Sequence, residues 1–411
     1  MIVLATAGSL GDLHPYLAVG RTLKARGHRV AVATVPAYRA RVEAAGLEMR
    51  GVGPDIDPED PEVARHAIDV EKGSEYIFRE LLMPHVRRML EDTRAALADA
   101  KLVLGHPIAL TVPIAAEERR VPWISVALAP LSFLSAYEPL RFAGNPVVSC
   151  LMRGPVWLRR GLLAFGRWKT KGWLTPLYDL RRELGLPEGP HPLFEGQHSP
   201  IRALALFSRL MGERKPDWPP QTVVTGFCFY DGGGELAPEL ERFLADGPPP
   251  LVFTLGSSAV HDPRRFYDDS LEAARAAGRR AVLLGRTAPA GGRDVLKVDY
   301  APYAKLFRRA AAVVASAGAG TIGQGLAAGR PMLLVPFGND QPDNAARVER
   351  LGVSRTVPRE AYNGRTAAAA LRSLLEDPGL SARAEACART VAEERGVEAA
   401  CDEIEEVLGS R

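Results

Sequence analysis

The stretch from Ala311 to Gly352 constrains the fold of this chain more than any other. It opens on a short apolar run, Ala311 to Val314, which is typical of a buried strand. A glycine-rich turn, a helical pattern and a second buried run, Met332 to Phe337, follow, and a polar loop then leads into a helix near Pro342. Turns that follow parallel strands lie at their carboxyl ends, where open α/β sheets bind ligands. The stretch therefore predicts two ligand-binding turns on an α/β sheet.

The two turns offer different chemistry. The first, residues 316–321, places glycines and free backbone N–H groups at a helix N-terminus, which suits a phosphate. The second offers the carboxylate of Asp340 and the amide of Gln341, which suit paired hydroxyls. Together they indicate a nucleotide-sugar site, with diphosphate on the first turn and sugar on the second.

The same glycines also fit a dinucleotide fingerprint. Gly318 to Gly323 reads G-x-G-x-x-G, and Asp340 lies about where a ribose-binding acid is expected. However, the fingerprint normally follows the first strand of its domain, and several strand-like runs precede this one. Simple packing of a helix on a sheet would explain the glycines but not the polar loop. An NAD-dependent enzyme remains a rival hypothesis.

The amino-terminal residues repeat the strand, turn and helix pattern. Ile2 to Ala5 reads as a strand, residues 8–12 as a turn, and Tyr16 to Ala25 as a helix with Pro15 at its first position. Val30 to Val35 is the next expected strand. A βαβ opening of this kind predicts a parallel sheet with right-handed crossovers.

Taken together, the two stretches resemble the family 1 glycosyltransferases, especially the bacterial members that decorate antibiotics, sterols and lipids. The family's amino-terminal pattern, GSxGDxxPxxALxxxLxxxGHxV, is matched at Gly8, Ser9, Gly11, Asp12, Pro15, Gly27, His28 and Val30. Its second pattern, HHGGxGT followed by VPxxxDQPxNA, is matched at Gly318, Gly320, Thr321, Pro336, Asp340, Gln341, Pro342 and Asn344. Two motifs in the right order are more specific than either alone.

Three positions depart from the family pattern. Ala315 and Ser316 stand where the family carries paired histidines, and Ala317 replaces the first glycine. The first histidine is a diphosphate ligand in the family, so that contact is in question here. A homologue that binds a nucleotide sugar without turning it over is therefore a further alternative.

The resemblance implies an α/β chain of the GT-B type, with two facing Rossmann-like domains, parallel sheets and an active site in the cleft. It implies transfer of a hexose from a UDP- or dTDP-sugar to a hydroxyl of a small apolar acceptor, whether phenolic, polyketide, sterol or lipid. The implied mechanism is inverting and metal-independent, and it needs no cofactor beyond the sugar-nucleotide donor. A helix dipole and N–H donors would stabilise the leaving diphosphate.

Asp12 is the expected general base. Transfer to a hydroxyl needs a group that takes the acceptor proton, and several bacterial members place an aspartate at this position. Asp12 also precedes a helix, so capping that helix is the alternative role. His14, two residues further on, is a rival base.

The resemblance also implies binding residues. Residues that are expected to line the acceptor pocket are Gly11, His106, Ala129, Pro130 and Phe133. Residues that are expected to bind the donor are Ser257, Ser258, Arg286, Tyr300, Ala301, Ser316, Gly318, Gly320, Thr321, Asp340 and Gln341. Among these, the serine pair would meet the diphosphate, and Tyr300 lies where an aromatic ring stacks on the base.

Length and composition place these motifs in two domains. The expected division is an acceptor domain over residues 1–213, a Pro-rich linker over 214–222, a donor domain over 223–390, and a helix over 391–411 that returns to the first domain. The net charge of +3 is too small to indicate nucleic acid. Four scattered cysteines and the lack of a leader or spanning segment favour a cytoplasmic location.

Residues 140–186 differ in character from the rest, because tryptophans and phenylalanine alternate with arginines and lysines. A basic, aromatic helix can lie on an anionic membrane surface. It can also be the helical excursion that roofs the acceptor site in the family. This simpler interpretation is favoured over membrane contact. The oligomeric state is not indicated by the sequence.

Overall fold

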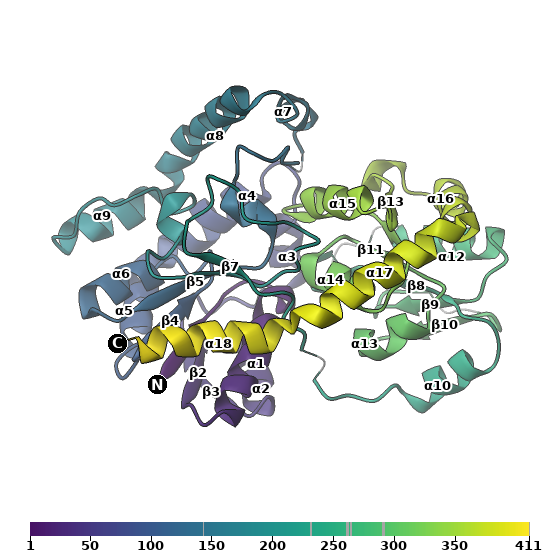
Figure 1. The fold of residues 1–411 in the computed structure, drawn as a ribbon, viewed down its shortest axis with the longest axis horizontal. Helices are drawn as coiled ribbons and strands as arrows, with labels where there is room; N and C mark the ends of the chain where they lie inside the picture. The colour runs from purple at the N-terminus through teal and green to yellow at the C-terminus, as the bar shows by residue number, and fades with distance from the viewer. Residues whose placement is uncertain (143, 231, 260–262, 264, 290–291, 411) are drawn as a thin grey trace. The chain divides into compact units, whose positions relative to one another are not determined.

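The computed structural model describes residues 1–142, 144–230, 232–259, 263, 265–289 and 292–410 (Figure 1). The chain forms two compact units. Unit 1 comprises Met1–Tyr230 and Arg395–Arg411, and unit 2 comprises Asp231–Glu394. Each unit contains one parallel sheet with helices packed on it, which confirms the α/β prediction.

Unit 1 is built on a seven-stranded sheet in the order β3-β2-β1-β4-β5-β6-β7. Every neighbouring pair is parallel. The strands are β1 (Ile2–Ala5), β2 (Val30–Thr34), β3 (Glu48–Gly51), β4 (Leu102–Gly105), β5 (Trp123–Ala127), β6 (Ala203–Ala205) and β7 (Thr222–Val224). The strand order reverses between β1 and β4, so a topological switch point lies at their carboxyl ends.

Both faces of this sheet are covered, as expected for parallel strands. Along β1, Ile2 and Leu4 pack into the cluster that includes α1 and α18, whereas Val3 and Ala5 pack into the cluster with α5, α6 and α9. The main helices of unit 1 are α1 (Leu10–Ala25), α2 (Arg39–Ala44), α3 (Pro61–Ala67), α4 (Gly73–Glu75), α5 (Val86–Ala96), α6 (Val112–Arg119), α7 (Pro146–Leu151), α8 (Val156–Lys171), α9 (Thr175–Glu183) and α18 (Gly396–Gly409).

Helix α1 begins at Leu10, earlier than the sequence predicts, and Pro15 lies inside it. The reason is local: Ser9 and Asp12 form a capping box, which fixes the first turn before the proline is reached. The prediction that Pro15 occupies the first helical position is therefore wrong.

Unit 2 has a six-stranded parallel sheet in the order β10-β9-β8-β11-β12-β13. Numbered within the unit, this is the 3-2-1-4-5-6 order of a doubly wound fold, with its switch point between β8 and β11. The strands are β8 (Leu251–Thr254), β9 (Ala281–Leu284), β10 (Val295–Val298), β11 (Ala312–Ala315), β12 (Met332–Leu334) and β13 (Ser354–Thr356). The helices are α10 (Pro238–Ala245), α11 (Gly256–Ala259), α12 (Phe266–Ala276), α13 (Tyr303–Leu306), α14 (Ala319–Ala327), α15 (Gln341–Arg350), α16 (Gly364–Glu376) and α17 (Pro378–Glu394).

The division between the units differs from the expected boundary at residue 223. Strand β7 pairs with β6 and completes the first sheet, so the chain leaves unit 1 only after Tyr230. The expected boundary at residue 223 therefore falls within β7, a strand of the first sheet. Strand β7 is three residues long, and only its pairing with β6 assigns it to the first sheet.

Candidate functional site

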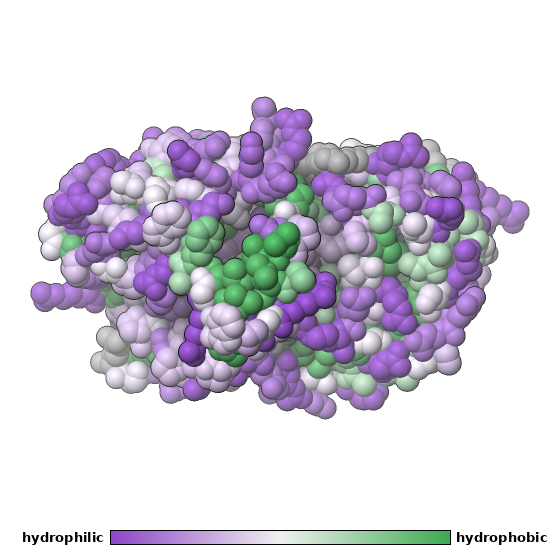
Figure 2. Space-filling view, turned by 90° about the horizontal axis from the view of Figure 1, so that it is seen from above, coloured by the Kyte–Doolittle hydropathy of each residue, from purple (hydrophilic) through white to green (hydrophobic). Residues whose placement is uncertain are grey.

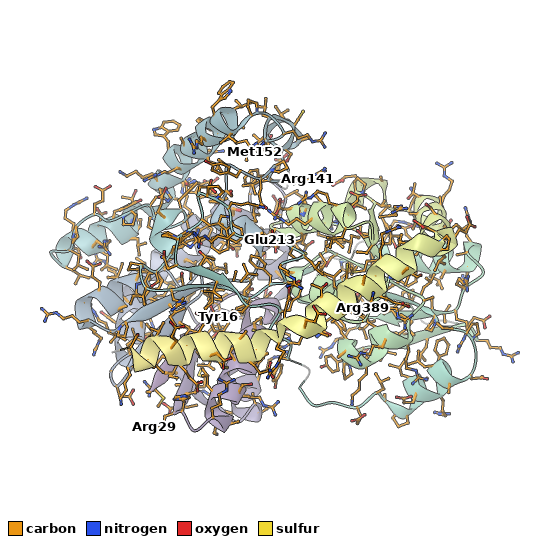
Figure 3. All side chains as sticks on the ribbon, in the orientation of Figure 1. Tyr16, Arg29, Arg141, Met152, Glu213 and Arg389 are labelled. Carbon is orange, nitrogen blue, oxygen red and sulfur yellow. The ribbon has the colours of Figure 1, made fainter. Side chains whose placement is uncertain are left out.

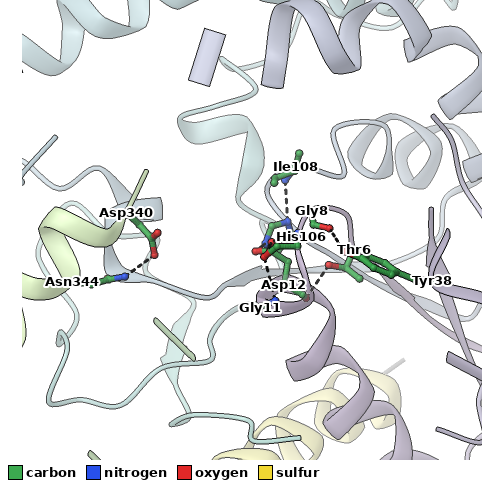
Figure 4. A network of polar contacts seen from close by, with 10 residues as sticks. Thr6, Gly8, Gly11, Asp12, Tyr38, His106, Ile108, Asp340 and Asn344 are labelled. Atoms are coloured by element: carbon green, nitrogen blue, oxygen red, sulfur yellow. Dashed lines mark hydrogen bonds and ion pairs between the residues drawn. The ribbon is translucent and has the colours of Figure 1, made fainter. Parts of the chain in front are cut away.

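The switch point of unit 1 brings together two titratable side chains from distant parts of the chain. Asp12 lies in the first turn of α1, directly after β1, and His106 follows β4. The His106 Nε2 and Asp12 Oδ1 atoms are 3.4 Å apart (Figure 4). The imidazole is 6% exposed and the carboxylate 28% exposed, so Asp12 remains accessible while His106 is buried behind it.

The carboxylate of Asp12 is held from its other side by Ser9. The Oδ2 atom accepts the Ser9 backbone N–H at 2.7 Å and the Ser9 hydroxyl at 3.0 Å. A Cβ atom on Gly8 would stand 2.5 Å from the same Oδ2, and Gly8 has a φ of +105°. Both space and backbone conformation therefore require glycine at this position.

The tautomer of His106 follows from its second contact. The Ile108 backbone N–H donates to His106 Nδ1 at 3.3 Å, so this nitrogen acts as an acceptor. In neutral imidazole the proton then resides on Nε2, the atom that faces Asp12. The protonated Nε2 of His106 thus faces the carboxylate at 3.4 Å, and Asp12 keeps the acceptor role that a base requires.

Further hydrogen bonds support this turn. Thr6 Oγ1 donates to the Asp12 carbonyl at 3.1 Å, and the Tyr38 hydroxyl donates to the Gly8 carbonyl at 3.0 Å. Sequence reasoning missed Thr6, Ser9 and Tyr38 as supports. Only Ser9 carried a signal, because Ser9 and Asp12 have the S-x-x-D spacing of a capping box.

His14, the rival base, has different surroundings. Its ring centroid lies 5.3 Å from that of Tyr230. Burial, helped by the charge of Arg41, lowers the pKa of His14 to about 4. A nitrogen with that pKa is no stronger a base than a carboxylate, and the geometry does not join it to the Asp12–His106 pair.

The expected acceptor residues divide into two groups. Gly11 is exposed at the start of α1, beside Asp12. Ala129, Pro130 and Phe133 are buried at the end of β5, and Phe133 stacks on Trp218 with ring centroids 4.0 Å apart. The Phe133 ring thus belongs to an aromatic core.

A cavity of about 490 Å³ lies beside His106 within unit 1. Its walls come from residues 105–110, α6, the start of β5, α9 and residues 189–200. Apolar side chains that line it include Leu110, Ile114, Val121, Trp123 and Leu177. A cavity of this size and character fits a small apolar molecule.

The switch point of unit 2 carries glycines and hydroxyls. Gly256 follows β8 with a φ of +68°, and a Cβ there would stand 3.3 Å from Thr321 Oγ1 and 3.8 Å from Ser316 Oγ. Tyr303 shares a 2.8 Å hydrogen bond with Thr254, the last residue of β8. Gly256, Ser316 and Thr321 thus meet where the strand order reverses.

Helix α14 starts at this point without a side-chain cap. Its N-cap is Gly318, with a φ of −63°, and a Cβ built on Gly318 or Gly320 would meet no heavy atom within 4 Å. Packing therefore does not require these glycines. They leave the uncapped N–H groups of a helix N-terminus open, an arrangement that suits an anion.

The departures from the family pattern lie beside this turn. Ala315 ends β11 and is buried, and the buried Ser316 hydroxyl donates to the Leu255 carbonyl. Ala317 has a φ of +69°, in the left-handed region that favours glycine. An alanine thus stands in a backbone conformation that a glycine would adopt without strain.

The second polar turn leads into α15. Asp340 is the N-cap residue of that helix, and its Oδ2 accepts from Asn344 Nδ2 at 2.7 Å (Figure 4). Gln341 is buried, and its side-chain carbonyl accepts the Phe337 N–H at 2.8 Å. Asp340 is partly exposed, whereas the Gln341 oxygen holds the loop.

The remaining expected donor residues have mixed surroundings. Arg286 is exposed after β9, and the Tyr300 ring is 69% exposed. Ala301 is buried. Ser257 and Ser258 lie in the short helix α11, but their side chains lie outside the described part of the structure.

The described part of the chain shows neither a metal-binding cluster nor a membrane-spanning helix. Among them, no group of three or more His, Cys, Asp or Glu side chains is placed to hold a metal ion. No helix in the described ranges is long and apolar enough to cross a membrane.

Comparison with known proteins shows similarity along the whole chain. Residues 2–125 match the Glycosyltransferase family 28 N-terminal domain, and residues 286–408 match the Erythromycin biosynthesis protein CIII-like, C-terminal domain. The chain is 36% identical over 432 residues to O-mycaminosyltylonolide 6-deoxyallosyltransferase of Streptomyces fradiae, covering 100% of this chain and 98% of the relative. It is 27% identical over 426 residues to a sterol 3-beta-glucosyltransferase of Arabidopsis thaliana, covering 98% of this chain and 67% of that protein.

Solved structures share the fold. The calicheamicin glycosyltransferase CalG4 has a TM-score of 0.73 at 20% identity, with 99% of this chain and 98% of the other covered. The glycosyltransferase VinC in complex with dTDP has a TM-score of 0.69 at 18% identity, with both chains fully covered. At these identities the likeness concerns the fold alone.

Proposed function

Because the chain belongs to the nucleotide-sugar-dependent glycosyltransferases of the GT-B fold, we propose that it transfers a hexose to an acceptor hydroxyl with Asp12 as general base. Because the family uses nucleotide sugars, membership in it argues against the alternative of an NAD-dependent enzyme. In agreement, the G-x-G-x-x-G turn follows β11, the fourth strand of its unit, and not the first.

The placement of Asp12 carries this proposal. In the transfer step, the acceptor oxygen forms a bond to the anomeric carbon while the bond from that carbon to the diphosphate oxygen breaks. The bonding electrons leave with the diphosphate, and the acceptor proton passes to the carboxylate. Ser9 fixes one carboxylate oxygen and His106 faces the other, so the base is held in one orientation.

The N-terminus of α14 would stabilise the leaving diphosphate. Its uncapped N–H groups are already oriented, so they act without reorganisation. The Thr321 hydroxyl adds a donor at the same turn, and Asp340 would bind sugar hydroxyls at the neighbouring one. With this source of positive potential the reaction proceeds without a metal ion, and direct displacement inverts the anomeric centre.

The names of related proteins suggest the substrate class. One is a 6-deoxyallosyltransferase that acts on O-mycaminosyltylonolide, and one neighbour was solved with dTDP. We therefore favour a dTDP-6-deoxyhexose over a UDP-sugar as donor. The macrolide and sterol acceptors in the relatives' names support a polyketide-like or sterol-like acceptor.

A ligand screen followed by product analysis tests the proposal. Melting temperature is measured with dTDP, UDP and NAD, since a ligand of the folded state raises it by mass action. We expect the largest rise with dTDP and none with NAD. Turnover is then measured with dTDP-6-deoxyhexoses, with and without EDTA, and the product's anomeric configuration is read by NMR. A retained configuration, or activity abolished by EDTA, would reject the mechanism, and binding without turnover would favour a non-catalytic homologue.

A further inference from the structure

The α7–α8 hairpin of unit 1 stands out by its charge. Residues 139–178 contain seven lysines and arginines and no aspartate or glutamate, although the whole chain has a net charge of only +3. Arg167 and Lys171 pair with glutamates of unit 1 at 2.8 Å. Arg153, Arg160 and Lys169 are exposed, so the hairpin presents a cationic surface.

The same hairpin exposes large apolar side chains. Helix α8 has no buried residue, and Trp157, Phe165 and Trp168 are 72%, 59% and 73% exposed. Positions 157, 161, 165 and 168 follow helical spacing and therefore share one face. Val147 of α7 is 66% exposed. Figure 2 shows hydrophobic residues gathered on the side where Figure 1 places α7 and α8. Single exposed apolar residues are common, but two tryptophans this exposed on one helix are not.

The opposite side of the hairpin is fixed to unit 1. Arg159 donates to the Ala136 carbonyl at 3.0 Å, and Thr170 contacts His191 at 3.3 Å. Met152, at the turn between the two helices (Figure 3), is fully buried. The aromatic face is therefore the outward side of a helix that is docked on its inner side.

We propose that this face docks on the surface of an anionic lipid bilayer. Indole rings prefer the boundary between headgroups and acyl chains, and flanking cations are attracted to anionic headgroups. A second copy of the chain is a poorer occupant, because it would bring two cationic faces together. Docking would place the protein where an apolar acceptor partitions.

The test measures sedimentation of the full chain with sucrose-loaded vesicles. One set is phosphatidylcholine alone, and the other contains phosphatidylglycerol. One variant combines Trp157→Ser, Phe165→Ser and Trp168→Ser, and a second combines Arg153→Glu, Arg160→Glu and Lys169→Glu. The matched control carries Arg29→Glu, Arg65→Glu and Arg182→Glu, which change the net charge equally at exposed sites elsewhere on unit 1.

We expect the wild type to prefer the anionic vesicles and to lose that binding at high salt. The charge variant should bind at least about 100-fold more weakly, since each of the three lost cations contributes roughly a factor of five near an anionic surface and the new carboxylates add repulsion. The aromatic variant should also lose binding, and the control should keep most of it. All variants should retain the melting temperature and turnover of a water-soluble acceptor.

Four results on binding and association would overturn the proposal. They are no vesicle binding by the wild type, equal binding to both vesicle types, an equal loss in the control, or self-association that the aromatic variant abolishes. A fall in vesicle-free turnover in the aromatic variant would likewise reject it and assign the face to the acceptor site.

Discussion

The two units share a strand order but use their switch points differently. In unit 1, Ser9 and Asp12 cap α1 with their own side chains, so the helix start is already occupied by a carboxylate. In unit 2, α14 starts at Gly318 with no side-chain cap and open space above it. The comparison teaches that one topology can present either a carboxylate or open N–H groups at its switch point, depending on how the first turn of the helix is capped.

The largest expected effect tests the capped turn. The change Asp12→Asn keeps the shape of the side chain and removes its basicity. We expect kcat to fall by roughly 10²- to 10⁴-fold, the range for losing a general base. Initial-rate kinetics measure it, and His14→Gln is the control that should stay near wild type. Retained turnover in Asp12→Asn, with loss in His14→Gln, would move the base to His14.

A smaller loss of turnover is expected when His106, which faces Asp12, is replaced. The change His106→Gln removes the imidazole that faces the Asp12 carboxylate at 3.4 Å, so the base loses an orienting polar contact. Turnover should fall by roughly 10-fold, the effect of losing about 1.5 kcal/mol. Adding it to Asp12→Asn should cost little more, because the partner is already gone. Fully additive losses would mean that His106 acts independently of Asp12, for instance on the acceptor.

The sequence revealed the two halves of the site unequally. Asp12 and the glycine turn could be found because their spacing is local. The contact with His106 could not, since 94 positions separate the residues and only the order β1 beside β4 brings them together. Likewise, Phe133 occurs in a plausible loop, and only the packing with Trp218 places its ring in a core.

The uncapped turn of unit 2 is tested by giving α14 a side-chain cap. Gly318→Asp adds an N-cap carboxylate at a backbone conformation that any residue adopts. The stability of α14 should stay the same or rise. Binding of dTDP should weaken by at least about tenfold, because the new carboxylate repels the diphosphate, and like charges 4 Å apart near a surface interact by about 4 kcal/mol. Gly318→Asn caps the helix without charge and is the control. Equal affinity in both variants would place the diphosphate elsewhere.

The smallest effect concerns the alanine with positive φ. Ala317→Gly should stabilise the fold by roughly 1–2 kcal/mol, because it relieves left-handed backbone strain. It should destabilise the fold by about 0.4–1 kcal/mol, because glycine has more conformational entropy in the unfolded chain. We expect a rise in melting temperature of about 1–2 °C in thermal denaturation. Gly8→Ala in unit 1 should do the reverse, because its Cβ meets Asp12. A destabilised Ala317→Gly would show that the alanine methyl packs too well to lose.

The assignment of the base to unit 1 and of the donor site to unit 2 is tested most directly by isothermal titration of dTDP into the wild type, Asp12→Asn and Gly318→Asp. If unit 1 supplies the base and unit 2 the donor site, Asp12→Asn binds dTDP as the wild type does, and Gly318→Asp binds it at least about tenfold more weakly. Weakened binding in Asp12→Asn together with unchanged binding in Gly318→Asp would contradict the account.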